Sequence, residues 1–118
     1  MLKAETLPWA VERRRVMKSK LYIENGDLVW RNNKGECHRD PKDGPAYIVA
    51  NGRKEYWFNG ELHRDAKDGP AIICADGRKQ YWFNDQRHRD PKDGPAVILA
   101  NGTKEYWFNG EKVCPKEE

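Results

Sequence analysis

Three histidines and three cysteines are the side chains of this sequence that could ligate a metal ion. His38, His63 and His88 follow one another at equal intervals, and each opens one copy of a repeated block. If each interval is one stacked unit of two β-strands, equivalent side chains lie about 10 Å apart, because adjacent strands are about 4.8 Å apart. Zinc holds its ligands at about 2.0–2.3 Å, so histidines of neighbouring units cannot share an ion. We predict no metal and no cofactor, and we expect the histidines to order neighbouring loops through hydrogen bonds.

Each histidine opens the tripeptide His-Arg-Asp, which also occurs in the catalytic loop of protein kinases. A kinase needs a glycine-rich phosphate loop and a lysine on a companion strand, and the sequence has neither. A kinase domain would also not fit within 118 residues. The tripeptide occurs three times, as expected of a structural repeat and not of a catalytic loop. We therefore predict that the protein is not an enzyme.

A Tyr-Trp-Phe triplet in each block is the next candidate for function. Successive side chains of a β-strand point to opposite faces, so the tryptophans lie opposite the tyrosines and phenylalanines. Each tryptophan shares its face with an acidic or amide residue, which indicates a half-exposed surface on which aromatic rings can anchor a partner. The predicted partner-binding residues are Trp57, Trp82, Trp107, Glu55, Gln80 and Glu105. The predicted structural residues of the repeat are His38, His63, His88, Tyr56, Tyr81, Tyr106, Phe58, Phe83 and Phe108.

The elements that must position these side chains follow from the same period. In one block, residues 46–50 form an apolar stretch, Asn51-Gly52 supplies the positive φ angles of a tight turn, and residues 54–58 form an aromatic stretch. Asn59-Gly60 marks a further bend, and the Asp-Pro-Lys-Asp-Gly-Pro segments are loops. The sequence predicts two strands per unit and an all-β fold, an elongated single-layer antiparallel meander of tandem β-hairpin repeats.

Comparison of the blocks with one another indicates which side chains share a face. Ala46, Ile48 and Ala50 recur with the same parity in all three blocks, whereas Tyr47 and Val49 have the other parity and are replaced only by apolar residues. Whether the tyrosines join the alanine and isoleucine side depends on the turn having two or three residues. The sequence leaves this register open.

The two ends of the chain differ from its middle. Residues 21–37 look like a degenerate copy of the block, and Val113 takes the place of the last histidine, as expected of terminal units. Residues 1–20 carry six basic and two acidic side chains, which leaves 16 basic and 17 acidic ones for the remainder. We assign residues 1–20 to a basic leader, 21–113 to a repeat domain of about four units and 114–118 to a polar tail. For the leader, a short helix over residues 7–18, a cap on the first unit and a solvated terminus stay open.

The composition suits a thin, elongated stack. Only 37% of the residues are hydrophobic and the mean hydropathy is −1.06, too little apolar material for one thick core. No apolar stretch reaches the length of a membrane span, and the N-terminus lacks the pattern of a signal peptide. Three cysteines form no repeated pairs, which favours a reducing compartment. We predict a cytoplasmic protein.

The segment from Trp57 to His63 has the pattern W-x-N-G-x-x-H, which resembles the core of the MORN repeat, a β-hairpin unit. The pattern recurs at Trp82 with Asp85 in place of the glycine, and at Trp107 with Val113 in place of the histidine. Arginine replaces the glycine that usually follows the histidine in that family. The resemblance covers residues 21–113. It implies a scaffold for partner proteins or, as in bacterial variants of the repeat, an antitoxin or immunity component that inhibits another protein.

The spacing of the tryptophans suggests the shape of a partner. Anchors about 10 Å apart match seven residues of an α-helix, which rise by about 10.5 Å. We therefore predict a protein partner that lies along the aromatic face, with a helix as one form it can take, and whose identity stays open. The alternative is single-stranded nucleic acid, bound through residues 1–20 and stacked on the tryptophans, but the repeats are close to neutral. Pairing of terminal strands into a homo-oligomer also stays open.

Overall fold

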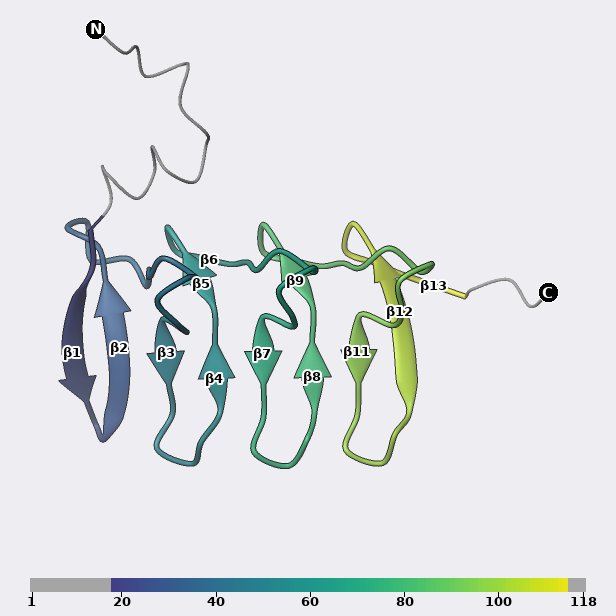
Figure 1. Ribbon diagram of the computed structural model, residues 1–118, viewed down its shortest axis with the longest axis horizontal. Coiled ribbons are helices and arrows are strands. Elements are labelled where there is room, and N and C mark those ends of the chain that lie inside the picture. The colour runs from purple at the N-terminus through teal and green to yellow at the C-terminus, as the bar shows by residue number, and fades with distance from the viewer. Residues whose placement is uncertain (1–17, 115–118) are drawn as a thin grey trace, which may run out of the picture.

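The computed structural model describes residues 18–114, which form short β-strands and no helix (Figure 1). The strands are β1 (Lys20–Glu24), β2 (Asp27–Arg31), β3 (Tyr47–Ile48), β4 (Lys54–Glu55), β5 (Trp57–Phe58), β6 (Glu61–Leu62), β7 (Ile72–Ile73), β8 (Lys79–Gln80), β9 (Trp82–Phe83), β10 (Gln86–Arg87), β11 (Val97–Ile98), β12 (Lys104–Phe108) and β13 (Glu111–Val113). The helix expected over residues 7–18, except its last residue, most of the basic leader and the tail beyond Cys114 lie outside the described residues.

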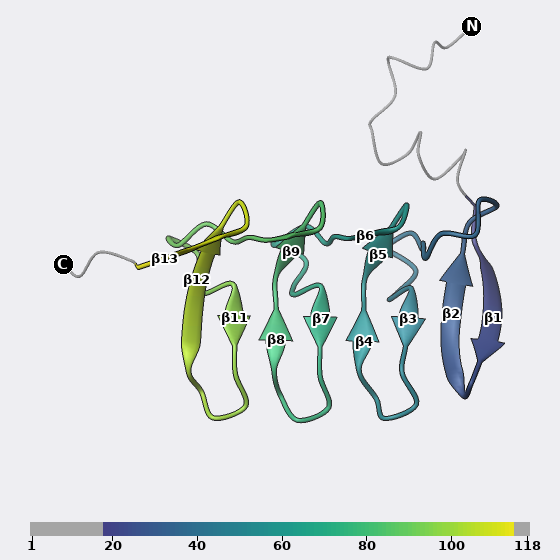
Figure 2. The same cartoon turned by 180° about the vertical axis from the view of Figure 1, so that it is seen from behind.

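Most strands belong to one antiparallel sheet in the order β1-β2-β3-β4-β7-β8-β11-β12-β13. The long hairpins β1–β2, β3–β4, β7–β8 and β11–β12 stand side by side in chain order, with their turns at the same end of the sheet (Figures 1 and 2). Because each hairpin pairs mainly with the next one, the sheet grows by one hairpin per unit. The predicted all-β antiparallel meander of tandem hairpins is confirmed.

The turns of the β3–β4, β7–β8 and β11–β12 hairpins have three residues, whereas the β1–β2 hairpin closes through the two-residue turn Asn25-Gly26. Val49 pairs with Arg53 across the loop, since the Val49 N–H donates to the Arg53 carbonyl at 2.8 Å. Three residues therefore form the loop, and of these only Gly52 has a positive φ, of 100°. The Asn51 side chain accepts a hydrogen bond from the Arg53 N–H at 2.9 Å, an Asx turn that adds one residue to the loop. The expectation of two positive φ angles at this turn is wrong.

This three-residue loop fixes the register that the sequence leaves open. Ile48 pairs with Lys54 and Tyr47 pairs with Glu55, and directly opposed residues lie on the same face. Tyr56 has the parity of Lys54 and therefore belongs to the side of Ala46 and Ile48, here named the alanine face. Glu55 belongs to the side of Tyr47, here named the tryptophan face because the tryptophan two residues later has the same parity as Glu55. The equivalent residues of the other units follow the same division.

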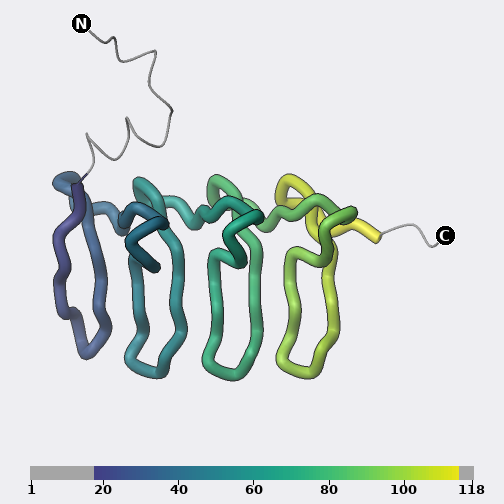
Figure 3. Tube along the Cα trace, viewed as in Figure 1, coloured from purple at the N-terminus to yellow at the C-terminus, as the bar shows by residue number. Residues whose placement is uncertain are grey.

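Each of the last three units also contains a short second hairpin, which the prediction of two strands per unit does not include; in the first unit an isolated bridge between Arg31 and Cys37 takes its place. β5 pairs with β6, β9 pairs with β10, and the end of β12 pairs with β13. Asn59 and Gly60 both have positive φ, 50° and 81°, as in the type I′ turns of tight hairpins. The Gly60 N–H donates to the Cys37 carbonyl at 2.9 Å, and equivalent bonds join the later units. The short hairpins thus form a second row along one end of the sheet (Figure 3).

The loops that follow the histidines cover part of the alanine face. Ala46, Ala71 and Ala96 are fully buried there. The Arg64 guanidinium lies 3.9 Å from the centre of the Tyr56 ring and donates to the Pro70 carbonyl at 3.0 Å. Arg39 and Arg89 donate to the equivalent proline carbonyls, and their guanidinium groups lie over the rings of Trp30 and Tyr81. The arginine of each His-Arg-Asp tripeptide therefore closes its loop over an aromatic ring, which is a structural role.

Candidate protein-binding surface

Hydrogen bonds hold the three predicted anchor tryptophans in one common pose. The Trp57 indole N–H donates to a Glu55 carboxylate oxygen at 2.8 Å, and the indoles of the next two units donate to Gln80 at 2.8 Å and to Glu105 at 3.1 Å. All three rings are half-buried. A bond between residues two apart requires that both side chains point to the same face. The structure thus brings all six predicted partner-binding residues together on the tryptophan face.

Glu55 is less accessible than a contact residue of an exposed face would be. Its relative exposure is 8%. One carboxylate oxygen accepts the bond from Trp57, and the other forms an ion pair with Arg53 at 2.9 Å. Glu55 therefore positions the indole and leaves the ring as the group that can meet a partner. Glu105 is more open and lies 3.9 Å from the Lys112 ammonium.

The tryptophans alternate with one residue from each short hairpin. Leu62 pairs directly with Trp57, and Arg87 pairs directly with Trp82, so each shares the face of its tryptophan. The Arg87 guanidinium lies 5.3 Å from the Trp82 ring centre and 4.8 Å from that of Trp107, within cation–π range of both. Leu62 is buried, and its position is equivalent to that of Arg87 one unit earlier. The residue that pairs with the tryptophan therefore changes from apolar Leu62 to basic Arg87 from one unit to the next.

A small pocket opens beside the tryptophan face where Arg87 lies. Its volume is about 250 Å³, and it is lined by Trp82, Asp85, Gln86, Arg87, Trp107 and Gly110. The Nε atom of Arg87 is buried and has no hydrogen-bond partner among the described residues. The opposing charge in the lining is Asp85, whose carboxylate already accepts the Leu62 N–H at 3.1 Å. Tryptophan and arginine together form the kind of surface on which partner contacts concentrate.

The repeated histidines have the structural role expected of them. The His38 Nδ1 accepts the Asn59 N–H at 2.9 Å, and His63 and His88 accept the equivalent N–H groups at 3.0 and 2.9 Å. In each case the acceptor belongs to one unit and the donor to the turn of the next. Nδ1 is therefore the acceptor atom of the ring in all three contacts. Each ring also packs on the phenylalanine of that next unit, at 4.4–4.6 Å between centres.

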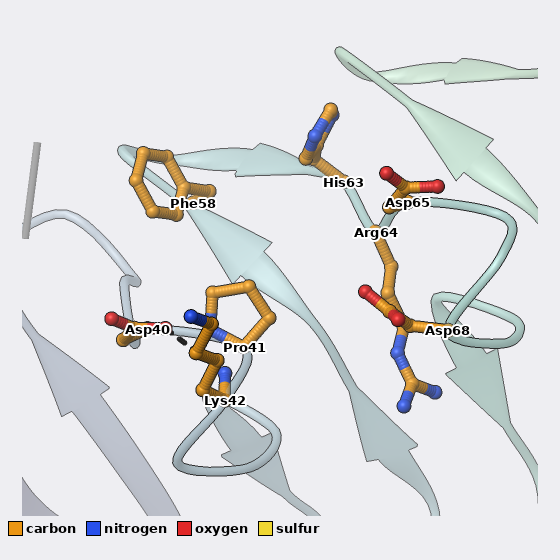
Figure 4. Close-up of a pocket in the computed structure, with 8 residues that line it drawn as sticks. All are labelled: Asp40, Pro41, Lys42, Phe58, His63, Arg64, Asp65 and Asp68. Carbon is orange, nitrogen blue, oxygen red and sulfur yellow. Dashed lines mark hydrogen bonds between the residues drawn. The ribbon is translucent and has the colours of Figure 1, made fainter. Parts of the chain in front are cut away.

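A larger pocket lies between the loops of two consecutive units (Figure 4). It has a volume of about 490 Å³ and is lined by Asp40, Pro41, Lys42, Phe58, His63, Arg64, Asp65 and Asp68. The lining contains no serine, threonine or cysteine. Two of its carboxylates close their own loops, since Asp40 and Asp65 accept the N–H groups two residues later at 2.9 and 3.0 Å. We assign the pocket to loop packing.

A row of lysines and isoleucines on the alanine face is a feature that sequence reasoning missed. Ile48, Lys54, Ile73, Lys79, Ile98 and Lys104 are neighbours in consecutive strands of the sheet. The lysines are exposed, whereas the isoleucines are half-buried. The recurrence of lysine at the same position of every block is a signal for this row, but only the register shows that lysine and isoleucine alternate. The two faces of the sheet are therefore chemically distinct.

The thiol of Cys37 lies at the start of the row of short hairpins and is strongly perturbed. Burial raises its pKa to about 12 from an ordinary value of 9.0, and the nearby Arg31 guanidinium opposes the shift only in part. The thiolate fraction near neutral pH is therefore about a thousandfold lower than that of an ordinary thiol. Cys114, by contrast, is exposed.

We expect iodoacetamide at pH 8 to label Cys114 rapidly and Cys37 slowly, as followed by peptide mass spectrometry. Because the unfolded chain loses this proton first, Cys37 also makes folding less favourable as the pH rises from about 9 towards 12. In urea, the labelling rates of the two cysteines should converge. Equal rates in the native protein would contradict the burial of this thiol.

Comparisons with known proteins do not assign the chain to a family. No family model, no curated protein and no solved structure matches the chain. The resemblance to MORN repeats therefore stays a prediction. Residues 18–114 hold no cluster of three or more His, Cys, Asp or Glu side chains that could bind a metal ion. Within the same residues, no helix has the length and apolar character needed to cross a membrane.

Proposed function

We propose that the protein is a non-catalytic binding module and that the row of Trp57, Trp82 and Trp107 receives a partner protein. The observation that supports this is the common pose of the three indoles, each held by a hydrogen bond to the residue two positions earlier. Rings that are already oriented lose little freedom on binding, so more of the contact energy appears as affinity. The arginine between two of the rings adds the second residue type that is enriched at such contacts.

An α-helix is the partner element that the row suits best. Equivalent positions in successive units are two strands apart, about 10 Å, which seven residues of a helix also span. The residues between the tryptophans give the row a direction, since Leu62 is apolar and Arg87 is basic. A partner helix would therefore present an apolar side chain between Trp57 and Trp82 and an acidic side chain between Trp82 and Trp107. A scaffold and an inhibitor or antitoxin would use the same contact and differ only in the partner.

Single-stranded nucleic acid is a weaker candidate for this surface. Bases bind tryptophan by stacking on the ring face. Between Trp82 and Trp107 that space is taken by the Arg87 guanidinium, which lies within 5.3 Å of both ring centres. Nucleic acid would then have to bind mainly through residues 1–17, which lie outside the described residues. A salt titration with single-stranded oligonucleotides separates this alternative, because binding to phosphates weakens steeply as salt rises.

We expect the double substitution Trp57→Ala and Trp82→Ala to abolish capture of the partner, because truncation of a central aromatic anchor commonly lowers affinity by about 2 kcal/mol or more. The measurement is quantitative mass spectrometry of proteins captured from the native host by wild-type and variant chains. The matched control is Lys54→Ala with Lys79→Ala on the alanine face, which should leave capture unchanged.

Circular dichroism confirms that each variant is folded before capture is compared. If the double variant loses its fold, Trp107→Leu in the last unit is the milder test, since fewer units pack beyond it. A folded tryptophan variant that captures the same proteins in the same amounts as wild type would rule out this surface. Loss of the same proteins in the lysine control would move the binding site to the alanine face.

A further inference from the structure

We propose that two copies of the protein pair through the free edge of β1, antiparallel and centred on Tyr22, so that their sheets become one. This inference goes beyond the proposed function and does not depend on it. Among the described strands, β1 pairs only with β2, so the backbone groups on its other side have no strand partner. Such an edge is a template for pairing with another chain unless its side chains protect it.

The side chains of β1 do not protect the edge. Leu21, Tyr22 and Ile23 are 49%, 45% and 74% exposed, and they are adjacent in one strand. The opposite end of the structure is more strongly charged, since the exposed residues of β12 and β13 are Lys104, Phe108, Glu111 and Lys112, of which Phe108 is apolar and 41% exposed. Charged side chains are a common means of blocking edge pairing. The asymmetry points to the β1 end as the surface that is covered in use.

The sequence of β1 is complementary to itself, which identifies a second copy as the occupant. The strand reads Lys-Leu-Tyr-Ile-Glu from Lys20 to Glu24. A two-fold axis at Tyr22 places Lys20 opposite Glu24 of the second copy, Leu21 opposite Ile23, and the two Tyr22 rings opposite each other. Opposite charges, apolar pairs and aromatic pairs are the cross-strand combinations that stabilise sheets. A shift of the axis to Leu21 or Ile23 would separate Lys20 from Glu24 of the second copy and shorten the paired part of β1.

The surroundings of Lys20 suit an incoming carboxylate. A pocket of about 410 Å³ on this side is lined by Lys18, Lys20, Tyr22 and Arg31, together with Asn32, Asn33 and Gly35. Within residues 18–114, Lys20 forms no ion pair, whereas Glu24 binds Arg31 of its own chain at 2.9 Å. Glu24 of the second copy would keep that bond and reach Lys20 as well. No carboxylate lines this pocket in a single copy, so the charges of the two copies are complementary.

The pairing should be weak and reversible. Five residues of strand from each copy bury less than the area of about 1,200 Å² at which stable complexes begin, so association is expected at high protein concentration. Sedimentation velocity of the full chain from micromolar to millimolar concentration measures it. We expect a monomer–dimer equilibrium that ends at the dimer, because a two-fold contact uses up the edge. A monomer throughout this range would overturn the proposal and leave residues 1–17 as the cover of the edge.

Charge reversal tests the register. Lys20→Glu and Glu24→Lys should each raise the dimer dissociation constant about tenfold or more, because both cross-strand pairs become like-charged. Lys20 lies opposite Arg31 and Glu24 opposite Asp27 in the β1–β2 hairpin, so each change creates an opposite-charge pair within the chain. Glu24→Lys also removes the ion pair with Arg31, so circular dichroism has to show that each variant is folded before dimerisation is compared. An equimolar mixture of the two variants should recover dimers as heterodimers. Failure of the mixture to dimerise, or dimers of either variant as tight as wild type, would overturn the pairing.

A cysteine at the two-fold axis gives an independent readout. Tyr22→Cys, in a chain that also carries Cys114→Ser, should form a disulfide-linked dimer under mild oxidation, because the two introduced thiols would face each other across the axis. Leu21→Cys in the same background is the matched control. Its thiol faces Ile23 of the second copy and should cross-link much more slowly. Equal cross-linking of the two variants would indicate random collision and overturn the register.

Discussion

Replacing His38 by alanine is expected to destabilise the protein by about 3 kcal/mol, measured as the free energy of unfolding in urea. The His38 side chain is 1% exposed, and its Nδ1 accepts the Asn59 N–H at 2.9 Å. Its ring packs edge-on against Phe58 with 4.5 Å between centres. Truncation leaves a cavity and removes the acceptor of a backbone N–H, and both effects are unfavourable in a buried position.

His88→Ala is the matched control for this substitution. The same two contacts exist there, to the Asn109 N–H at 2.9 Å and to Phe108 at 4.6 Å. Phe108 and Asn109 are exposed, however, so water can take over the hydrogen bond. We expect a loss of about 1 kcal/mol. Equal losses in the two variants would show that burial does not decide the role of the histidine.

Replacing Gly69 by alanine is expected to destabilise the protein by about 2–3 kcal/mol. Gly69 has a φ of 132°, a backbone region that favours glycine, and a Cβ there would lie 2.8 Å from an Arg64 guanidinium nitrogen. The end of the arginine side chain would have to shift on the ring of Tyr56, from whose centre it lies 3.9 Å. The substitution therefore adds backbone strain to the disturbance of a closing contact over the alanine face. Thermal and urea unfolding measure the sum.

Gly77→Ala separates these two contributions. Gly77 has a φ of 99°, but no atom lies within 4 Å of the place that a Cβ would take, so alanine there adds backbone strain alone. In a chain that carries Arg64→Ala, the penalty of Gly69→Ala should fall to that of Gly77→Ala, since the arginine is no longer displaced. If the penalty of Gly69→Ala is the same with and without Arg64, the contact between arginine and tyrosine does not stabilise the loop.

The hairpin architecture could be predicted because its signals recur in register. Asn-Gly or Asp-Gly pairs, apolar stretches of strand length and the Tyr-Trp-Phe triplet return in every block, and each recurrence supports the others. The parity of Trp57 and Glu55 also follows from the alternation of a strand. The hydrogen bond between them is consistent with that parity. Their role in binding a partner stays a prediction.

The features that could not be predicted depend on contacts between units. The side chain of Asn51 lengthens the turn by one residue, and only that register places Lys54 beside Ile48 and Ile73. The short hairpin at Asn59-Gly60 is held to the previous unit by the Cys37 carbonyl, which is far away in the sequence. The burial of Glu55 results from its bonds to Trp57 and Arg53. These contacts cannot be predicted from the composition or from the period of the repeat.

Equivalent backbone hydrogen bonds connect each short hairpin to the preceding unit. The repeated block is therefore an interchangeable segment. Gly60, Asp85 and Gly110 each donate a backbone N–H to the carbonyl of a residue at the equivalent position one block earlier, at 2.8–3.0 Å. Duplication of one block in the gene would therefore insert a complete module between existing joints. The protein would lengthen by about 10 Å and gain one tryptophan, with no new type of junction. The length of the sheet can thus change in fixed increments of one unit.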